Sequence, residues 1–203
     1  TIPSYASLYG LPLPLSKKYN IHTYGFHGIS YQYICHELKK KYGKNPKKVI
    51  VCHLGNGSSI CAIKNGKSVD TSMGFTPAEG LMMGTRSGDI DPGIIFYLQK
   101  KGIKNVEHLL EFESGLKGIS GTNDMKAIWK KARQGNKNCQ LALDMYCYRL
   151  QKYIGAYAAV LGGIDALVFT AGIGEHAWYV REKVCASLGY LGIKTDSLQN
   201  KNN

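Results

Sequence analysis

The pattern of hydrophobic and polar positions in the first half of the chain predicts one helix followed by three strands. Apolar residues recur at helical spacing over 31–38. The short apolar run 49–52, bounded by lysines and glycine, predicts a buried strand. Residues 60–64 and 67–70 predict two further strands, and the Asn-Gly pair between them indicates a type I′ hairpin.

The second half of the chain is mostly helical in pattern. The apolar run 165–170 predicts a strand, and the Gly-x-Gly segment after it opens a helix that should end near Leu188. Residues 115–124 predict a loop that ends in good helix caps. Further helices are predicted over 92–101, 106–112, 125–133 and 138–161, and the last of these is long and largely buried.

The predicted elements define a fold class and a domain division. Three prolines in residues 1–20 disfavour a long helix after Leu11, so we expect this segment to be a connecting arm and residues 21–203 to form one domain. Antiparallel strands followed by a strand that is reached through helices predict an α/β fold of the ribonuclease H type, with a mixed sheet and flanking helices. Glycine loops follow the strand ends and should gather at one sheet edge, with Arg86 beside them.

The net charge of +12 at pH 7 bears on the choice of partners. The densest lysine cluster, within residues 39–48, suggests nucleic-acid binding. However, it lies at the end of a predicted helix, where cations complement the helix dipole, and no recognition motif accompanies it. We therefore expect no nucleic-acid partner, whereas anionic small substrates are compatible with the charge.

Cysteine usage and hydropathy indicate the compartment. None of the six cysteines forms a C-x-x-C pair, and several lie inside apolar segments, as buried free thiols do in a reducing cytosol. No apolar run reaches roughly 18 residues, and the N-terminus lacks a signal pattern. We expect a cytoplasmic protein without a membrane partner.

The stretch 82–92 contains the most distinctive candidate chemistry, because Arg86 stands between Gly84 and Gly88 and two carboxylates follow it. Basic residues elsewhere are nearly all lysine, with 22 Lys against four Arg. A planar guanidinium binds two oxygens of a phosphate or carboxylate at once, which an ammonium does not. Arg86 is therefore a candidate anion ligand, and the alternative is a tight surface turn with a solvated arginine.

Three other loops are candidate anion sites. His27 precedes the first predicted helix, where backbone N–H groups and the helix dipole favour an anion. The turn 55–57 follows the first strand, and residues 172–176 join the last strand to a helix. The ordinary alternatives are a histidine that caps its own loop, a β-turn built on Asn and Gly, and a Gly-x-Gly turn without a ligand.

Five motifs occur in order along the chain: Y-G-F-H-G-x-S, H-L-G-N-G-S-S, M-G-F-T-P-x-E-G-L-M-M-G-T-R-S-G-D-I-D-P, E-S-G-L-x-G-I-S-G and T-A-G-I-G-E. Together they resemble the acetate kinase family over essentially the whole chain. The resemblance implies the acetate and sugar kinase, Hsp70 and actin superfamily, and reversible transfer of the γ-phosphoryl group of ATP to acetate. Propionate kinases share the central motif closely and remain an alternative.

The resemblance also implies roles for individual residues. His27 and Arg86 would stabilise the transferring phosphoryl group, since a guanidinium and an imidazolium neutralise charge in a loose transition state. Phe26 and Pro77 would line the pocket for the acetate methyl group, and Asn56 would reach the transferred group. The implied nucleotide-binding residues are His53, Leu54, Gly55, Asn56, Gly57, Asp124, Met125, Lys126, Gly172, Ile173, Gly174, Glu175 and His176.

Four positions depart from the family pattern. Ile29 and Tyr31 replace the Thr and second His of G-F-H-G-T-S-H, a change that bears on the hydrogen bonding of the His27 loop. Lys126 replaces an arginine against the adenine, so stacking should weaken. His176 replaces the asparagine of G-I-G-E-N, with no predicted effect.

The resemblance covers only the second domain of the family, with the N-terminal domain missing. Pro3 aligns with the last residue of D-T-A-F-H-Q-T-M-P, so the essential aspartate of that motif would precede Thr1. The family ligands of Mg²⁺ or Mn²⁺ would likewise lie outside the chain.

Three expectations follow for the chain alone. It should bind ADP or ATP more weakly than a complete enzyme, show no acetate-dependent turnover, and form a homodimer through the helix 138–161. The alternative from another class is a non-catalytic module that binds nucleotide or dimerises.

Overall fold

Four strands form one mixed sheet in the computed structural model, which describes residues 2–202. The strands are β1 (Lys48–Leu54), β2 (Ser58–Lys64), β3 (Lys67–Thr71) and β4 (Ala166–Thr170), in the order β3-β2-β1-β4. β1 pairs antiparallel with β2 and parallel with β4, and β2 pairs antiparallel with β3. This topology confirms the predicted α/β fold of the ribonuclease H type.

The turn between β2 and β3 has the predicted type. Asn65 and Gly66 have φ values of 51° and 76°, and two successive positive values are characteristic of a type I′ turn. Asparagine tolerates this left-handed conformation, and glycine adopts it without a Cβ penalty. The local sequence therefore suffices to specify this hairpin.

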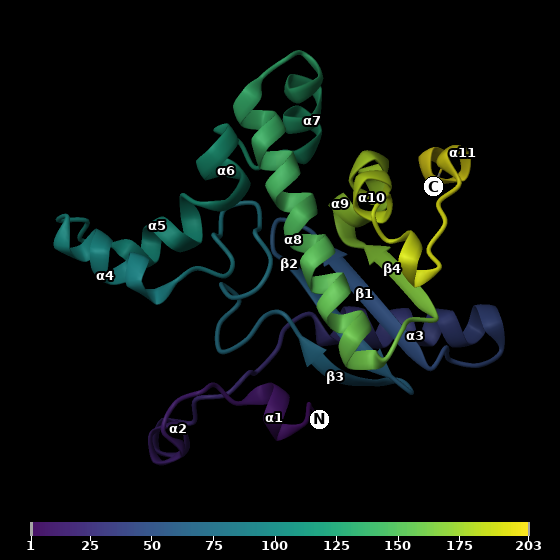
Figure 1. Cartoon of the computed structure of the whole chain (residues 1–203), viewed down its shortest axis with the longest axis horizontal. Coiled ribbons are helices and arrows are strands. Elements are labelled where there is room, and N and C mark those ends of the chain that lie inside the picture. The colour runs from purple at the N-terminus through teal and green to yellow at the C-terminus, as the bar shows by residue number, and fades with distance from the viewer. Residues whose placement is uncertain (1, 203) are drawn as a thin grey trace.

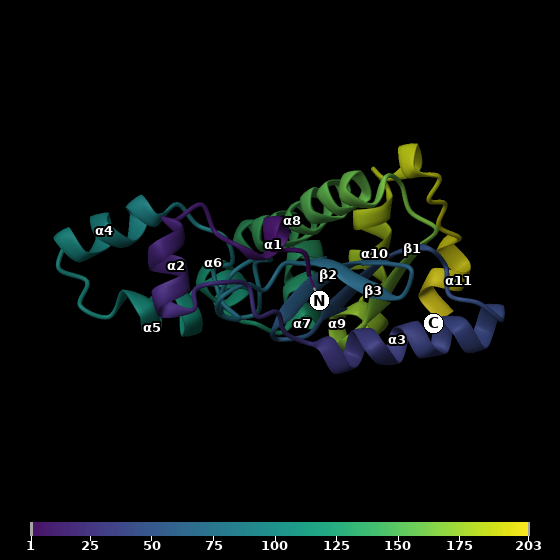
Figure 2. The ribbon, with the colours of Figure 1, turned by 90° about the horizontal axis from the view of Figure 1, so that it is seen from below.

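Helices cover both faces of the sheet. Figure 2 shows α3 (Gly28–Tyr42) along one face and α8 (Lys137–Leu161) along the other. In Figure 1, α8 crosses in front of β1 and β2. Both helices were predicted, and α8 begins one residue before the predicted start.

Side chains of β1 alternate between the two helical layers. Ile50, Cys52 and Leu54 belong to the large core cluster that contains the buried face of α8. Val49 and Val51 belong to a smaller cluster on the α3 face. Because successive strand residues point to opposite faces, the apolar run 49–52 of this strand contributes to both cores.

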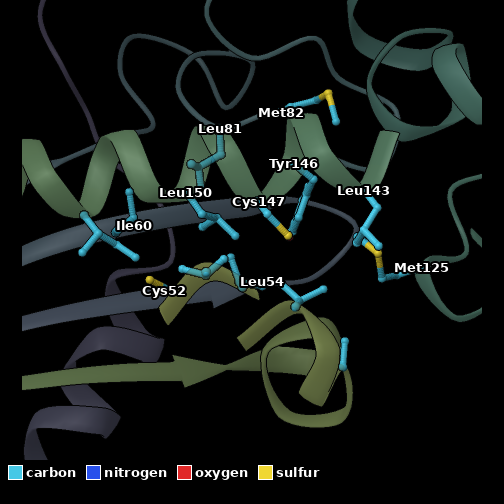
Figure 3. Close-up of a cluster of buried hydrophobic side chains, with 14 of the residues drawn as sticks. Cys52, Leu54, Ile60, Leu81, Met82, Met125, Leu143, Tyr146, Cys147 and Leu150 are labelled. Atoms are coloured by element: carbon cyan, nitrogen blue, oxygen red, sulfur yellow. The ribbon is translucent and has the colours of Figure 1, made fainter. Parts of the chain in front are cut away.

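The core under α8 fixes this helix on the sheet (Figure 3). Tyr146 and Leu150 of α8 pack with Leu54 and Ile60 of the sheet, and each of these side chains is at most 1% exposed. The Tyr146 hydroxyl hydrogen-bonds with the Ser58 hydroxyl at 3.1 Å, so the buried phenol is satisfied. Truncating a fully buried leucine to alanine costs about 2–5 kcal/mol, which makes this layer a rigid support for the loops above it.

No helix within residues 2–202 is long and apolar enough to cross a membrane.

Shorter helices surround the three layers. The shorter helices are α1 (Ser4–Ser7), α2 (Leu13–Tyr19), α4 (Pro92–Lys100), α5 (Val106–Phe112), α6 (Gly115–Ser120), α7 (Met125–Arg133), α9 (Ala171–His176), α10 (Trp178–Cys185), a 3₁₀ helix (Gly189–Leu191) and α11 (Ser197–Asn202).

The N-terminal segment has no long helix, but its prolines begin a short one. Pro12 is the N-cap of the seven-residue helix α2, and a second proline lies in its first turn. Proline is tolerated there because the first N–H groups of a helix have no intrahelical partner. The prolines thus start α2 rather than exclude it.

The prediction of a loop over 115–124 is wrong for its first half, because Gly115–Ser120 form α6. The N–H groups of Leu116 and Lys117 donate to the carbonyls of Met83 and Gly84, both at 2.9 Å. These tertiary hydrogen bonds satisfy the N-terminus of a glycine-rich helix that has weak local propensity.

The helix predicted from residue 171 to about residue 188 is wrong in extent, because the structure has two helices. Ala177, with φ −94° and ψ 72°, separates α9 from α10. Arg181 of α10 donates to the carbonyl of Gly174 at 2.9 Å and also to that of Glu175. A side chain from the next helix therefore satisfies the C-terminus of α9, and neither glycine nor proline marks the break.

Candidate functional site

The two glycine loops that follow β1 and β4 lie at one edge of the sheet. β1 and β4 are parallel, with His53 paired to Thr170, so their carboxyl ends coincide. A Cβ added to Gly55 would lie 3.9 Å from the Cβ of Ala171, which places the turn 55–57 against the start of α9. The structure therefore brings together the loops that the sequence placed at this edge.

The loop that contains Arg86 is held by backbone hydrogen bonds. The Gly84 N–H donates to the Asn56 carbonyl at 2.9 Å, and the Ser114 N–H donates to the Thr85 carbonyl at 3.0 Å. A Cβ on Gly84 would lie 2.0 Å from the Asn56 Oδ1, so only glycine fits here without displacement. The loop is thereby fixed both to the turn 55–57 and to α6.

Arg86 extends its guanidinium toward the turn 55–57. Its Nη1 lies 3.3 Å from the position of a Cβ added to Gly57 and 3.8 Å from the Met83 Sδ. The side chain is half-buried, and no carboxylate within residues 2–202 forms an ion pair with it. A guanidinium that is partly desolvated and lacks a protein anion is a strong candidate ligand for a substrate anion.

The two carboxylates that follow Arg86 have structural partners. Asp89 accepts hydrogen bonds from the Gly80 N–H at 2.8 Å and from the Tyr153 hydroxyl at 2.6 Å. Asp91 caps α4 by accepting from the Gly93 N–H at 2.7 Å. Both carboxylates therefore anchor the loop and α4, and neither pairs with Arg86.

His27 and His53 form a stacked pair next to Arg86. Their ring centroids lie 3.9 Å apart, with an interplanar angle of 19°. The Nδ1 of His27 lies 2.8 Å from the Ser59 Oγ, and the Nδ1 of His53 lies 2.9 Å from the Ser30 Oγ. The Nε2 of each ring has no hydrogen-bond partner among residues 2–202 and is available to a ligand.

The His27 side chain does not cap the helix that follows it. It occupies the N-cap position of α3 with a left-handed φ of 63°, but its side chain makes no capping hydrogen bond. A positive φ at a residue with a bulky side chain is uncommon and is often found at functional sites.

The imidazolium expected at His27 is not the form of the free chain. Burial, followed by the nearby His53 and Arg86, lowers the pKa of His27 to about 4. Burial also lowers the pKa of His53, although Glu175 partly opposes that shift. Two stacked rings beside a guanidinium disfavour another positive charge, so both histidines are neutral at pH 7 in the chain without ligand.

A cavity of about 510 Å³ lies next to the two glycine loops. Its volume is within the range of small-molecule sites. The predicted nucleotide-binding residues that line it are Gly55, Asn56, Asp124, Met125, Lys126, Gly172, Ile173 and His176. Five further residues line it that the sequence interpretation missed, namely Asn123, Trp129, Ala177, Trp178 and Tyr179.

The missed aromatic residues form one wall of the cavity. Trp129 of α7 stacks on Tyr179 at 4.5 Å with an interplanar angle of 8°, and Trp178 meets Trp129 edge-on at 5.7 Å. At helical positions such residues would usually be assigned to a core. The break at Ala177 lies immediately before Trp178 and Tyr179, and it has no local sequence signal.

Asn123 links this cavity to the turn after β1. Its Nδ2 donates to the Asn56 Oδ1 at 2.9 Å, so the Asn56 amide nitrogen is left as a donor. The next residue, Asp124, caps α7 by accepting from the N–H groups of Lys126 and Ala127. A polar residue before a helix cap was the one available signal for Asn123.

Several predicted site residues lie outside the cavity. Leu54 is fully buried in the core. Gly174 packs against Phe169, because a Cβ added to Gly174 would lie 3.3 Å from the Phe169 carbonyl carbon. Glu175 accepts from the Ala171 N–H at 3.1 Å and from the Thr170 hydroxyl at 3.3 Å. The structure thus places these three residues as supports of the glycine loop and not as its lining.

The segments that carry Phe26 and Pro77 lie side by side. The N–H groups of Tyr24 and Gly25 donate to the Gly74 carbonyl at 3.0 and 3.4 Å. Phe26 and Pro77 are both half-buried. Phe26 immediately precedes His27 in the chain, and neither Phe26 nor Pro77 lines the 510 Å³ cavity.

The residues described here do not form a metal site. Within residues 2–202, no group of three or more His, Cys, Asp and Glu side chains is close enough to hold an ion. Asp89, Asp91 and Asp124 are each occupied by backbone N–H donors. The donor set therefore does not fit a resident cation.

Comparison with known proteins gives a consistent set of relatives. The whole chain, residues 1–203, matches the acetokinase family. It is 54% identical over 209 residues to the acetate kinase of Caldicellulosiruptor saccharolyticus and 53% identical over 205 residues to that of Lawsonia intracellularis. These alignments cover 100% and 98% of this chain but 52% and 51% of the relatives, so the chain spans about half of their length.

Solved structures agree with the sequence relatives. The crystal structure of Porphyromonas gingivalis acetate kinase matches with a TM-score of 0.95 and 44% identity, over 99% of this chain and 52% of that one. A propionate kinase from Francisella tularensis matches with a TM-score of 0.95 and 42% identity, over 100% of this chain and 53% of that one.

Proposed function

Because the chain belongs to the acetokinase family, we propose that it is the nucleotide-binding half of an acetate kinase, which transfers the γ-phosphoryl group of ATP reversibly to acetate. The observation that carries this proposal is the Arg86 guanidinium, which has no carboxylate partner within residues 2–202 and lies beside a glycine turn that also lines a 510 Å³ cavity.

In the proposed complex, the nucleotide occupies the cavity and its phosphates follow the turn 55–57 toward Arg86. The base lies against the wall formed by Trp129, Trp178 and Tyr179, since aromatic side chains provide a flat apolar surface. Lys126 contributes charge but no planar face at this wall.

The transferring group lies between Arg86 and the histidine pair. The guanidinium binds two of its oxygens, and the free Nε2 atoms of His27 and His53 and the Asn56 amide are available to donate to others. Phosphoryl transfer through a loose transition state needs positioning and charge stabilisation more than covalent help. Phe26 and Pro77 then bound the acetate methyl group.

Metal, assembly and compartment are part of the same proposal. Mg²⁺ or Mn²⁺ would arrive with the nucleotide phosphates and be held by parts of the enzyme beyond these residues. Residues 1–20 would be the arm to the N-terminal domain and residues 21–203 the nucleotide-binding domain. A second copy of the chain would complete a homodimer, and the free cysteines suit a reducing cytosol.

Propionate kinase is the second candidate, favoured by the match to the Francisella structure. The test is turnover by a chain extended to the full length of its relatives, with acetate or propionate as acceptor. We expect ADP formation that depends on acetate more than on propionate, and none from the 203-residue chain alone. A folded full-length protein that forms no ADP with either acid would contradict the proposal.

A further inference from the structure

The hydrogen bonds behind His27 are the strongest unexplained feature of the site. The Nδ1 of His27 lies 2.8 Å from the Ser59 Oγ, and the same oxygen hydrogen-bonds with the Tyr31 hydroxyl. Ser59 is fully buried, and Tyr31 is 4% exposed. Tyr31 stands at one of the positions where the sequence departs from the family motif.

The number of protons in this chain of contacts limits how it can be arranged. Tyr31 is a phenol whose pKa burial raises far above the physiological range, so it always carries its proton. Within residues 2–202 the Tyr31 hydroxyl makes one hydrogen bond, to the Ser59 hydroxyl. The Thr71 hydroxyl also lies near the phenol, but its own hydrogen bond runs to the Ile60 carbonyl at 3.4 Å. If Ser59 donated to Tyr31, the phenol proton would be buried without a hydrogen-bonded acceptor, which destabilises that arrangement.

Tyr31 must therefore donate to Ser59, whose own proton then has one remaining acceptor, the Nδ1 of His27. An imidazole that accepts at Nδ1 while neutral carries its proton on Nε2. We infer that Tyr31 and Ser59 are positioning residues that lock neutral His27 in the Nε2–H tautomer, so that it presents a hydrogen-bond donor to an anion.

The neighbouring His53 supplies an internal contrast. Its Nδ1 contacts the Ser30 hydroxyl at 2.9 Å, but Ser30 has no further hydrogen-bond partner within residues 2–202. A lone hydroxyl can either donate or accept, so this contact fixes the ring without fixing the tautomer. The effect inferred here is therefore specific to His27.

The role of His27 as a donor to the substrate rests on the proposed phosphoryl transfer. The tautomer itself rests only on the hydrogen bonds to Ser59 and Tyr31. With Nε2–H fixed, His27 can donate to a phosphoryl oxygen without first acquiring a proton. This suits a ring whose pKa is lowered to about 4 by burial, His53 and Arg86.

The test is ¹⁵N NMR of the histidine rings in the 203-residue chain without ligand, at pH 7.5. The signal of His27 is assigned by its loss in His27→Gln. We expect the Nε2–H pattern in the unmodified chain and a mixture of tautomers in Tyr31→Phe. Tyr33→Phe, which changes an exposed tyrosine on the same helix, should leave His27 unchanged.

Two results would overturn the inference: an Nδ1–H or mixed pattern in the unmodified chain, or an unchanged pattern in folded Tyr31→Phe. If that variant does not fold, Ser59→Ala serves in its place, with the same expected mixture. In the full-length enzyme, Tyr31→Phe should lower kcat without raising the KM for ADP. Loss of the tautomer without a kinetic effect would contradict the proposed role of His27, whereas an inactive parent enzyme with the expected spectrum would contradict only the proposed function.

Discussion

A substitution of Arg86 distinguishes its proposed role, binding of the transferring phosphoryl group, from the alternative of a solvated arginine in a surface turn. In a full-length enzyme, Arg86→Lys keeps the charge and loses the two-pronged contact. We expect kcat to fall on the order of 10²- to 10³-fold, or about 3–4 kcal/mol, with ADP affinity nearly unchanged. Steady-state kinetics with saturating acetate measure this.

Arg149→Lys is the matched control, since Arg149 lies on α8 and, within residues 2–202, forms no hydrogen bond or ion pair with the residues that hold the Arg86 loop. It should leave kcat within about twofold. If Arg86→Lys also stays within that range, Arg86 is a surface arginine and has no part in phosphoryl transfer.

The histidine pair predicts how stability depends on pH. The pKa of His27 is lowered to about 4 in the folded chain, from 6.5 in the unfolded one. Between these values the unfolded chain binds a proton that native His27 does not, so the free energy of unfolding should fall as the pH drops from 6.5 toward 4. Above pH 6.5 this contribution is complete. Urea unfolding at pH 7 and pH 5 measures it.

His27→Gln should remove part of this acid-induced loss. His36→Gln, at an exposed position of the same helix, should leave the loss unchanged. A pH dependence that is identical in all three proteins would mean that His27 does not titrate as its surroundings indicate.

At the scale of elements, α8 positions the Arg86 loop through Asp89. The Tyr153 hydroxyl of α8 donates to Asp89, which also accepts from the Gly80 N–H and so closes the loop between residues 80 and 89. Tyr153→Phe should cost about 1 kcal/mol of stability and lower kcat more than ADP affinity, because Arg86 loses its fixed position. Chemical unfolding and kinetics of the full-length variant test this.

Tyr148→Phe is the control on the same helix, at a side chain that is 59% exposed. It should change neither quantity. Equal effects from Tyr148→Phe and Tyr153→Phe would show that the α8 surface as a whole, and not the Asp89 contact, supports the loop.

The elements also show where sequence reasoning succeeds. β1, the hairpin after β2 and α7 follow from local signals: an apolar run, an Asn-Gly turn and an aspartate cap. α6 and the break at Ala177 do not, because the carbonyls of the Arg86 loop and the Arg181 guanidinium stabilise them from elsewhere in the chain.

The same distinction separates the predicted site residues from the missed ones. The glycine loops and Arg86 were found because their residue types are unusual for their positions. Trp129, Trp178 and Tyr179 were missed because an aromatic side chain on a helix looks alike in a core and in a cavity wall. The break between α9 and α10 at Ala177, which places Trp178 and Tyr179 at the cavity, shows that these residues are cavity wall and not core.

The whole molecule has exposed apolar surface beyond the core. The helix proposed as the dimer interface, α8, exposes Tyr148, whereas α4 exposes Phe96 and Tyr97 by about as much, 61% and 59%. If the chain dimerises, light scattering at micromolar concentration should give twice the mass of 22.4 kDa.

Charged variants identify the surface used. Tyr148→Lys should produce monomers if α8 forms the interface, and Phe96→Lys should do so if α4 forms it. A monomeric unmodified chain would remove the homodimer from the account without affecting the nucleotide site.

The measurement that tests the central claim most directly is an ADP titration of the 203-residue chain, followed by calorimetry and tryptophan fluorescence together. The two tryptophans of the chain, Trp129 and Trp178, both line the proposed nucleotide cavity. We predict binding of one ADP per chain, weaker than in a complete enzyme, with a fluorescence change that saturates along the same curve as the heat. A folded chain that gives neither heat nor a fluorescence change at millimolar ADP would contradict the assignment of this half as the nucleotide site.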